Sequence, residues 1–405
     1  MVIITIMDKN RNKTVFVGMS GGVDSSVSAA LLKEQGYNVV GVFIKTWHPP
    51  FLACNEEEER RDAMRVCAHL DVPFLTFDFE DVYKKDVADY MISEYKKGRT
   101  PNPDVMCNKY VKFGAFFKKA LAMGADYVAT GHYARTSAEN AFTQVLGSSP
   151  KAQPDHSQKH FLLSLLKGSD PSKDQSYFLW TLRQEQLSKI LFPVGHLKKS
   201  DVRKLANKFK LPVAEKKDSQ GICFLGAVDL KDFLKHYIKE KKGKVLNEKG
   251  EEIGFHDGVV FYTFGERHGF TITKKSPIDG PYYVVAKDIK KNLLIVSQNR
   301  NYLKKSTDIF LLKNSSCSDQ SSSQVYFKDN FCFVLENVNW IADIPEENKN
   351  YTAQIRYHGE LFPCIIKIIN KTKAEIIFKK PILAASGQSI VIYDENVCVG
   401  GGVII

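Results

Sequence analysis

Apolar and polar positions follow two different periods in the early part of the chain. Residues 15–17 and 39–45 are short apolar runs rich in β-branched side chains, which predicts two buried strands. Residues 27–35 lie between them with helical spacing and are followed by Gly36, a favoured residue at the end of a helix. A strand, a helix and a strand at this spacing predict a βαβ unit and therefore an α/β fold with a doubly wound parallel sheet.

The same alternation continues to about residue 130. Helices are predicted at 56–70, 82–97 and 110–123, strands at 74–77 and 127–129, and a proline-containing loop at 98–109. Residues 131–135 follow the last of these strands, at the end where open parallel sheets bind their ligands. We therefore expect residues 20–25, the loop at 98–109 and residues 131–135 to share one crevice.

The pattern changes beyond this sheet. Residues 136–169 are polar and mixed, which predicts an exposed excursion, and helices are predicted at 183–191, 200–208 and 228–238. Short strands predominate after residue 243, and the first two are expected at 282–286 and 293–297. The later strands, at 351–357, 364–369, 375–378, 389–393 and 398–404, predict a small antiparallel β-barrel. The expected domains are 1–190, with 136–169 as an insertion, a small mixed domain at 191–303, and the barrel at 304–405.

Composition adds a preference for an anionic partner. The chain has 405 residues and a formal net charge of +11, which suits a nucleotide or a nucleic acid but does not choose between them. The first residues, MVIITIMDKNRNK, lack the order of a signal peptide and the Arg- and Ser-rich pattern of an organelle leader. No apolar run in the sequence reaches transmembrane length. We therefore expect a cytoplasmic protein that does not associate with membranes.

One turn carries the strongest chemical signal, the sequence VFVGMSGGVDSS at residues 15–26. Gly21 and Gly22 allow a close approach of the backbone to a ligand, and the N–H groups at the start of the following helix favour an anion. The Gly-Lys-Ser/Thr of a Walker A loop does not follow. The order S-G-G-x-D-S resembles the pyrophosphate loop of ATP pyrophosphatases, which split ATP into AMP and pyrophosphate. The alternative is a plain serine-rich turn between a strand and a helix.

Eight cysteines are present, and none forms the C-x-x-C pair of zinc-ribbon or thioredoxin-like sites. Cys107 and Cys223 differ from the others because they lie in predicted loops rich in Pro, Asn, Asp, Lys and Gly. Lys109, Lys216 and Lys217 are their neighbours in sequence and would favour thiolates. Either cysteine alone could be a packed thiol. Together with an ATP-splitting loop, the pair suggests sulfur transfer, in which one cysteine carries a persulfide and the other resolves it.

Four further motifs make the resemblance specific. NPDVMCNK, GHYAR, KDQSYFL and DSQGICFLG follow SGGVDSS in this order, and together they resemble the tRNA-specific 2-thiouridylase family over nearly the whole chain. The resemblance implies an adenine nucleotide alpha hydrolase-like catalytic domain that makes 2-thiouridine at the wobble position of tRNAs for Lys, Glu and Gln. It also implies ATP with Mg²⁺, adenylation of the uridine C2 oxygen, a persulfide sulfur-donor protein as partner (a cysteine desulfurase or a relay), and a monomeric enzyme.

The functional positions of that family map onto this sequence residue by residue. By resemblance Cys223 receives the persulfide, Cys107 is the nucleophile that forms a transient disulfide with it, and Asp104 is the general acid/base. The implied ATP contacts are Gly18, Met19, Ser20, Gly21, Gly22, Val23, Asp24, Ser25, Ile44 and Gly131. The implied tRNA contacts are Asn102, Pro103 and Asp104 around the target base, and His132, Lys173, Asp174, Gln175, Arg356, Tyr357 and Gln388 elsewhere. Ile44 stands where methionine is common, and an apolar contact with adenine survives that change.

Other classes of function remain open at this point. A ligase or amidotransferase acting on a small molecule would use the same ATP loop but needs no cysteine pair, and no glutaminase segment is apparent. A tRNA-binding protein without activity is a further alternative, which ATP-dependent AMP release on addition of tRNA would exclude. His132 could equally be a loop histidine with satisfied hydrogen bonds, and Arg356 with Tyr357 could be ordinary barrel surface.

Overall fold

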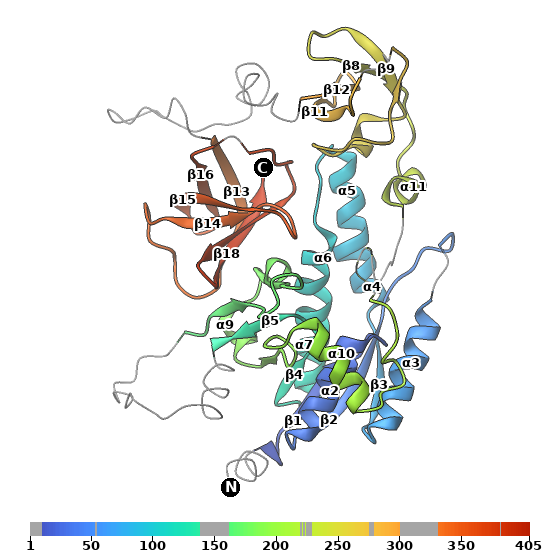
Figure 1. Ribbon diagram of the computed structural model, residues 1–405, viewed down its shortest axis with the longest axis vertical. Coiled ribbons are helices and arrows are strands. Elements are labelled where there is room, and N and C mark those ends of the chain that lie inside the picture. The colour runs from blue at the N-terminus through green and yellow to red at the C-terminus, as the bar shows by residue number, and fades with distance from the viewer. Residues whose placement is uncertain are drawn as a thin grey trace.

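The computed structural model describes residues 10–52, 55–137, 162–218, 221, 223, 229–274, 279–299, 331–380 and 382–405. Figure 1 shows three bodies: an α/β part coloured blue to green, a small yellow sheet, and a red barrel. Helix α5 (Tyr90–Lys96) extends from the first body to the yellow sheet. None of the helices described is long and apolar enough to cross a membrane.

A five-stranded parallel sheet forms the centre of the first body, in the order β3-β2-β1-β4-β7. Its strands are β1 Thr14–Gly18, β2 Asn38–Lys45, β3 Phe74–Asp78, β4 Tyr127–Ala129 and β7 Ile190–Leu191. Side chains alternate along β1, so that Val15 and Val17 pack into one hydrophobic cluster and Phe16 into the other. Both faces are therefore buried, and the predicted doubly wound parallel sheet is confirmed.

Helices cover both faces of this sheet. The cluster around Val15 and Val17 includes residues of α2 (Val23–Glu34), α3 (Glu56–His69) and α10 (Lys199–Lys208). On the other face lie two continuous helices, each with a π-helical segment. The first comprises α4 (Glu80–Tyr83), η1 (Lys84–Asp89) and α5, and the second α6 (Pro103–Met106), η2 (Cys107–Phe116) and α7 (Phe117–Ala122).

The predicted loop at 98–109 is wrong beyond residue 102, because the helix begins at Pro103 and not at residue 110. The Asn102 side chain accepts a hydrogen bond from the Val105 backbone N–H at 3.2 Å and so caps this helix. Proline suits the first helical position, where its missing N–H is not needed. Cys107 therefore lies on a helix rather than in a loop.

Two short strands correct the limits of the predicted excursion at 136–169. β5 (Ala134–Thr136) pairs antiparallel with β6 (Leu165–Lys167), and β6 pairs in turn with β18 (Val397–Ile404). Residues 138–161 lie outside the described residues. The segment then continues as the short helices η3 (Ser176–Leu179) and α9 (Gln184–Leu187). The predicted helix at 183–191 is too long, because residues 190–191 belong to β7.

The middle body is a five-stranded sheet in the order β10-β9-β8-β12-β11, preceded by α11 (Leu230–Lys235). Its other elements are β8 Gly243–Leu246, β9 Glu252–His256, the short helix η4 Val259–Phe261, β10 Thr271–Ile272, β11 Tyr283–Asp288 and β12 Leu293–Ser297. β12 pairs with β8 in parallel and the other pairs are antiparallel. The helix predicted at 228–238 is shorter than expected, and both predicted strands of this region are present.

The last body is a closed antiparallel barrel, as predicted. Its strands follow the order β13-β16-β15-β14-β17-β18, and β13 pairs with β18 to close the ring. The new strands are β13 Phe331–Trp340, β14 Tyr351–Gln354, β15 Leu361–Asn370, β16 Lys373–Phe378 and β17 Ser389–Asp394. β13 was not predicted, and β14 ends before the predicted limit at residue 357. β6 and β5 extend the same sheet from β18.

Polar contacts fix the barrel against the first body. The Tyr177 hydroxyl donates to the Ile355 carbonyl oxygen at 2.9 Å, and an Arg99 guanidinium nitrogen lies 3.0 Å from a Glu336 carboxylate oxygen. The expected domain limits stay predictions. α10 comes after residue 190 but packs on α2, and the limit at residue 303 lies outside the described residues.

Candidate active site

The glycine–serine turn, residues 18–25, joins β1 to α2 at the carboxyl edge of the parallel sheet. Gly21 has a φ of +70°, and a Cβ atom there would lie 2.3 Å from the Glu59 carbonyl oxygen, so only glycine fits. Gly22 precedes α2 in an extended conformation, and no side chain among the described residues caps this helix. The first N–H groups of α2 are thus available to an anion.

Serine hydroxyls brace the turn from within. Ser26 Oγ and Ser25 Oγ donate to the Gly22 carbonyl oxygen at 2.7 and 3.1 Å, and the Ser20 N–H donates to Ser25 Oγ at 3.2 Å. Gly131, which follows β4, lies against the same helix start, because a Cβ atom there would be 2.7 Å from the Ser25 backbone nitrogen. The loops after β1 and β4 therefore meet at one edge of the sheet.

The apolar residues expected to contact ATP lie inside the first body. Met19 and Val23 are buried in the cluster on the α2 side, and Ile44 is buried in the cluster on the opposite face. Gly18 ends β1 beside the Phe116 ring, with its virtual Cβ 3.5 Å from Cε1. A contact of these residues with the nucleotide stays a prediction.

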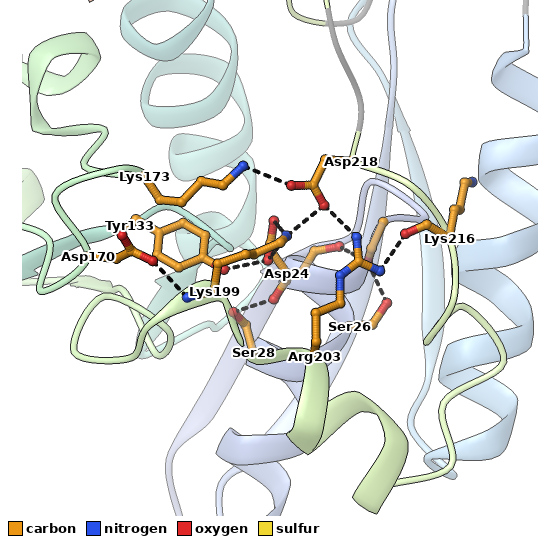
Figure 2. A network of polar contacts seen from close by, with 12 residues as sticks. Asp24, Ser26, Ser28, Tyr133, Asp170, Lys173, Lys199, Arg203, Lys216 and Asp218 are labelled. Carbon is orange, nitrogen blue, oxygen red and sulfur yellow. Dashed lines mark hydrogen bonds and ion pairs between the residues drawn. The ribbon is translucent and has the colours of Figure 1, made fainter. Parts of the chain in front are cut away.

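Asp24, in the first turn of α2, lies at the centre of an ionic network (Figure 2). Its Oδ1 accepts hydrogen bonds from Lys199 Nζ and from the Tyr133 hydroxyl, both at 2.7 Å. Lys199 Nζ also lies 2.8 Å from Asp218 Oδ1. One lysine of α10 therefore bridges the glycine–serine turn and the segment that leads to Cys223.

Asp218 is held by several cations at once. Besides Lys199 it pairs with Arg203 at 2.6 Å and with Lys173 at 2.9 Å, as Figure 2 shows. Partial burial alone would raise the pKa of this carboxyl, but the hydrogen bonds and charges of Lys199 and Lys173 hold it well below its usual range. Asp218 is therefore ionised at neutral pH and ties the cysteine segment to α10.

The residues expected to contact tRNA near β6 make internal hydrogen bonds. Asp174 Oδ1 accepts from the backbone N–H groups of Gly168 and Ser176 at 3.0 and 3.1 Å. Gln175 Oε1 accepts from the Tyr133 N–H at 3.0 Å. These bonds shape the chain around the Asp24 network, and a contact of the same residues with tRNA stays a prediction.

The barrel residues expected to contact tRNA lie on the side that faces the first body. Arg356 is exposed, and the Tyr357 ring lies 4.5 Å from the Phe178 ring, centre to centre. Burial raises the pKa of Tyr357 to about 12, and the charges of Asp174 and Asp104 add to this effect. The side chain of Gln388 accepts from the Ala385 N–H at 3.1 Å. The barrel thus brings Tyr357 near the helix that carries Cys107.

The two cysteines singled out in the sequence lie together. Their Sγ atoms are 3.5 Å apart, with Cys107 as the donor, and Cys107 is fully buried on η2. The backbone of Cys223 is held on both sides, because its N–H donates to Asp104 Oδ1 at 2.8 Å and its carbonyl accepts from the Tyr83 hydroxyl at 2.7 Å. The structure therefore groups the three residues expected to be catalytic, Asp104, Cys107 and Cys223.

The two thiols are electrostatically unequal. Burial raises the pKa of the Cys107 thiol, and the neighbouring Cys223 raises it further. The hydrogen bond from Cys107 lowers the pKa of Cys223, and the charge of Lys112 acts in the same direction against the effect of burial. The pair therefore favours a thiolate at Cys223 and a thiol at Cys107. Burial also raises the pKa of Asp104, against the hydrogen bond from the Cys223 N–H and the charge of Lys112, which lower it.

Lys112, and neither Lys109 nor Lys216, is the cation at this pair. Lys109 Nζ lies over the Tyr110 ring, 4.9 Å from its centre, and Lys216 pairs with Asp62 at 2.7 Å. The expectation that Lys109 and Lys216 favour the thiolates is therefore wrong, and for Lys217, which is exposed, it stays a prediction. Sequence reasoning missed Lys112 because ordinary helical spacing places residues 107 and 112 on different faces.

His132 is buried between the rings of Phe113 and Phe192. Its Nδ1 lies 2.7 Å from Thr130 Oγ1, and its Nε2 lies 3.4 Å from Lys112 Nζ. Burial and the charge of Lys112 hold the pKa of His132 well below its ordinary value, so the neutral ring accepts a hydrogen bond from the lysine. A contact of His132 with tRNA stays a prediction.

Three family models match consecutive parts of the chain. The tRNA methyl transferase HUP domain matches residues 13–227, the tRNA methyl transferase PRC-barrel domain residues 231–298, and the aminomethyltransferase beta-barrel domain residues 330–404. The first match alone covers more than half of the chain.

Curated relatives match over almost the full length. The tRNA-specific 2-thiouridylase MnmA of Geobacillus thermodenitrificans is 42% identical over 403 residues, which are 98% of this chain and 96% of the relative. The protein of the same name from Francisella philomiragia is 39% identical over 401 residues, 98% of this chain and 100% of the relative. Among solved structures, the U34-tRNA thiolase NcsA of Methanococcus maripaludis aligns with 59% of this chain and 73% of its own, at 16% identity and a TM-score of 0.33.

Proposed function

The chain belongs to the tRNA-specific 2-thiouridylase family and is a tRNA-thiolating enzyme, and we propose that it converts the wobble uridine of tRNAs for Lys, Glu and Gln into 2-thiouridine. In this proposal ATP adenylates the uridine C2 oxygen, and a cysteine persulfide then supplies the sulfur. The observation that carries it is the 3.5 Å contact between the Sγ atoms of Cys107 and Cys223. A contacting pair of thiols serves sulfur transfer, whereas a small-molecule ligase has no use for it.

The glycine–serine turn is the proposed binding site of the ATP phosphates. Its support is the uncapped N-terminus of α2, where backbone N–H groups and the helix dipole attract an anion. Lys199, which is bound to Asp24 at 2.7 Å, adds positive charge beside the turn. The nucleotide would then extend from this edge toward the segment of Cys223.

Mg²⁺ fits this end of the site on chemical grounds. The ion usually binds through one or two carboxylates together with substrate phosphates. Asp24 is the carboxylate of the turn that would hold it, and in the described ranges no group of three or more His, Cys, Asp or Glu side chains could bind a metal ion without such phosphates. When bound, the ion neutralises negative charge on the phosphates.

The first chemical step activates the base. The C2 oxygen attacks the α-phosphorus of ATP while the Asp104 carboxylate takes the proton from N3, the bond to pyrophosphate breaks, and AMP remains linked to C2 through that oxygen. Asn102, Pro103 and Asp104 are the proposed surroundings of the base, which must leave its stack at a cost of a few kcal/mol. Burial raises the pKa of Asp104, which makes its carboxylate a stronger proton acceptor than an exposed aspartate.

The second step delivers the sulfur. The Cys223 thiolate takes the outer sulfur of a donor persulfide, and the donor leaves as a thiolate. The resulting persulfide anion attacks C2 and AMP departs. Cys107 then attacks the inner sulfur, a disulfide forms between Cys107 and Cys223, and the outer sulfur stays on C2. The two thiols supply the electrons that reduce this sulfur, the proton of Cys107 goes to N3 of the base, and an external thiol reopens the disulfide.

The tRNA is proposed to bind across the first body and the barrel. The proposed contacts are Lys173, Asp174, Gln175, Arg356, Tyr357 and Gln388, whereas the ring of His132 is buried and faces Lys112 and Thr130. Support comes from the net charge of +11, from the exposed Arg356, and from the position of Tyr357 near Asp104. We further propose a monomeric enzyme in the cytoplasm that receives sulfur from a donor protein.

Nucleoside mass spectrometry tests this function. The protein is incubated with total tRNA, ATP, Mg²⁺ and glutathione persulfide as the sulfur source, with Cys223→Ser as the parallel variant. The expected result is 2-thiouridine and an equal amount of AMP with the intact protein, and no thiolated base with Cys223→Ser. AMP without a thiolated base would contradict the persulfide step, and the absence of both with every tRNA would contradict the assignment of the ATP site.

A further inference from the structure

A π-helical turn brings a lysine to the cysteine pair. Cys107 and Lys112 lie five positions apart on η2. In an α-helix of about 3.6 residues per turn, residues at this separation point about 140° apart. The wider turn of a π-helix, closed by i→i+5 hydrogen bonds, returns them to nearly the same face, and such turns concentrate at functional sites. The chemical consequence is an ammonium group beside two thiols.

The ammonium group of this lysine faces polar groups from other segments of the chain. Its ammonium group is within hydrogen-bonding reach of the Cys223 sulfur and lies 3.4 Å from His132 Nε2. The other titratable groups that face the pair are Tyr83 of α4 and Asp104 of α6, which bind the Cys223 backbone. Burial raises the pKa of Tyr83 well above its ordinary value and lowers that of His132 well below its own. Both groups are therefore neutral.

The charges of Lys112, Asp104 and the two cysteines must balance. Lys112 is the cation that acts on all three acidic groups of the site, and an anion without a partner is costly in a buried position. Burial raises the pKa of Asp104, whereas the hydrogen bond from Cys107 and the charge of Lys112 lower that of Cys223. Burial alone would lower the pKa of Lys112, but the negative charges of the cysteines raise it. The arrangement thus pairs a charged lysine with the Cys223 sulfur.

We propose that Lys112 is a catalytic residue of sulfur transfer, which holds the Cys223 sulfur as an anion, first as the thiolate that takes up sulfur and then as the persulfide that delivers it. His132 acts as a positioning residue, because its neutral ring accepts a hydrogen bond from the lysine. The inference rests on the proposed function, since that function makes Cys223 the sulfur carrier. In the uptake step one S–S bond forms as another breaks, and Cys223 has no proton to lose because Lys112 already holds it as a thiolate.

The first test needs neither tRNA nor ATP. The rate at which iodoacetamide alkylates Cys223 is measured against pH by mass spectrometry of its peptide, in the wild type and in Lys112→Met, Lys112→Arg and Lys109→Met. Lys109 is the matched control because it lies on the same helix but over the Tyr110 ring. In Lys112→Met we expect the midpoint to rise by about one pH unit or more, a tenfold loss of thiolate at neutral pH. Lys112→Arg and Lys109→Met should remain close to the wild type.

The second test measures sulfur uptake. Glutathione persulfide is added to the same proteins, and the gain of one sulfur on the Cys223 peptide is followed in time. Uptake at neutral pH should be roughly tenfold slower in Lys112→Met, because the thiolate fraction falls by that factor, and should recover in Lys112→Arg. Thermal unfolding confirms that each variant is folded, and Lys112→Gln replaces Lys112→Met if the latter is not.

The outcomes separate the inference from the function on which it rests. An unchanged alkylation profile in a folded variant without the Lys112 charge, or an equal shift in Lys109→Met, would overturn the assignment of Lys112 even if the wild type makes 2-thiouridine. A shifted profile restored by arginine supports the assignment. If that shift appears but no protein forms 2-thiouridine, the proposed function fails and the role of Lys112 toward the Cys223 thiolate stands.

Discussion

The Sγ atoms of Cys107 and Cys223 lie 3.5 Å apart, although 116 positions separate the two residues in the sequence. A disulfide bond is about 2.05 Å long, so a shift of about 1.5 Å would join them. Cys107 is fixed on a buried helix, and the Cys223 backbone is held by Asp104 and Tyr83. The pair can therefore alternate between thiols and a disulfide with little rearrangement, as the proposed resolution step requires.

Replacing either cysteine should block thiolation at a different stage. Cys223→Ser cannot carry the sulfur, so AMP release continues but 2-thiouridine falls by about a hundredfold or more. Cys107→Ser still loads sulfur onto Cys223 and transfers it to the base, but it cannot break the inner S–S bond. We expect a covalent complex of enzyme and tRNA that a reducing thiol releases. Denaturing electrophoresis with labelled tRNA, with and without reductant, measures it.

Cys67→Ala is the matched control for these two variants. Cys67 is a buried thiol on α3 whose pKa is raised to about 11 by burial, and it packs away from the pair. Its loss should leave both AMP release and 2-thiouridine formation near the wild-type rates. A covalent complex in Cys223→Ser, or its absence in Cys107→Ser while thiolation stops, would contradict the order of the proposed steps.

The substitution Asp104→Asn should stabilise the folded protein and inactivate the enzyme. Burial raises the pKa of Asp104, so the native state binds this proton more tightly than the unfolded chain. The wild type therefore loses stability as the pH rises from the ordinary pKa of the carboxyl to the raised one, by about 1.4 kcal/mol for each pH unit between these two values. The asparagine variant, which keeps the shape and an oxygen acceptor for the Cys223 N–H, avoids this loss.

Urea unfolding at several pH values measures that difference. The gain of Asp104→Asn over the wild type should grow with pH and then level off above the raised pKa, while thiolation falls by about a hundredfold or more if Asp104 is the acid/base. A gain that is independent of pH would show that the carboxyl is not desolvated. Full activity of the asparagine variant would contradict its role in proton transfer.

Much of the fold could be predicted because its signals are local. The apolar runs of β1 and β2 and the helical spacing between them define the parallel sheet, and the pair Gly21–Gly22 marks a turn that in fact needs a positive φ. The barrel could be predicted from the alternation of apolar and polar residues along β15 to β18. β6 was missed because its short apolar run follows a long polar stretch and pairs with β18 far along the chain.

The chemistry at the cysteine pair could be predicted only in part. The motifs pointed to Asp104, Cys107 and Cys223, but the helix start at Pro103 and the π turn of η2 decide what surrounds them. No periodicity in the sequence distinguishes a π turn from an α turn, so Lys112 was passed over in favour of lysines closer in sequence. The ionic network of Asp24, Lys199 and Asp218 was equally hidden, because its members come from three separate segments.

Asp218→Asn should loosen the segment that carries Cys223. The variant loses ionic contacts with Lys199, Arg203 and Lys173, and we expect a loss of stability of about 1 kcal/mol at neutral pH, since the carboxyl is partly exposed. The pKa of Asp218 is lowered in the folded state, so its contribution is present above the ordinary Asp pKa and disappears as the pH falls below it. The deficit relative to the wild type should shrink in acid.

Two measurements check this prediction. Thermal unfolding between acidic and neutral pH gives the stability difference, and the rate of limited proteolysis near residues 218–223 reports the freedom of the segment. Asp201→Asn is the control, because Asp201 pairs only with Lys204 on the exposed side of α10 among the ion pairs described here. Equal proteolysis of the two variants would mean that the network does not hold the segment in place.

Gly21→Ala should abolish ATP use through the geometry of the turn. Its φ of +70° is unfavourable for alanine, and the added Cβ would lie 2.3 Å from the Glu59 carbonyl oxygen. Gly124→Ala separates the strain of a positive φ from the clash of the added Cβ. Gly124 also has a positive φ, +91°, but no atom lies within 4 Å of the position that a Cβ would take. We expect a cost of about 1 kcal/mol for Gly124→Ala, with full activity, and a larger one for Gly21→Ala. The measurements are the unfolding free energy and the ATP-dependent AMP release of both variants. An equal loss of stability in the two variants would argue against a clash at Gly21.

His132 distinguishes a contact with tRNA from a role in positioning Lys112. The buried ring faces Lys112 and Thr130, so we expect His132→Leu, which removes the acceptor, to raise the midpoint of Cys223 alkylation by less than Lys112→Met does, and to leave the Kd for tRNA unchanged. His132→Gln keeps an oxygen acceptor and should remain closer to the wild type. Fluorescence anisotropy with labelled tRNA and the alkylation profile are measured on the same preparations. A weaker Kd with an unchanged profile would instead assign His132 to tRNA binding, as the family resemblance implies.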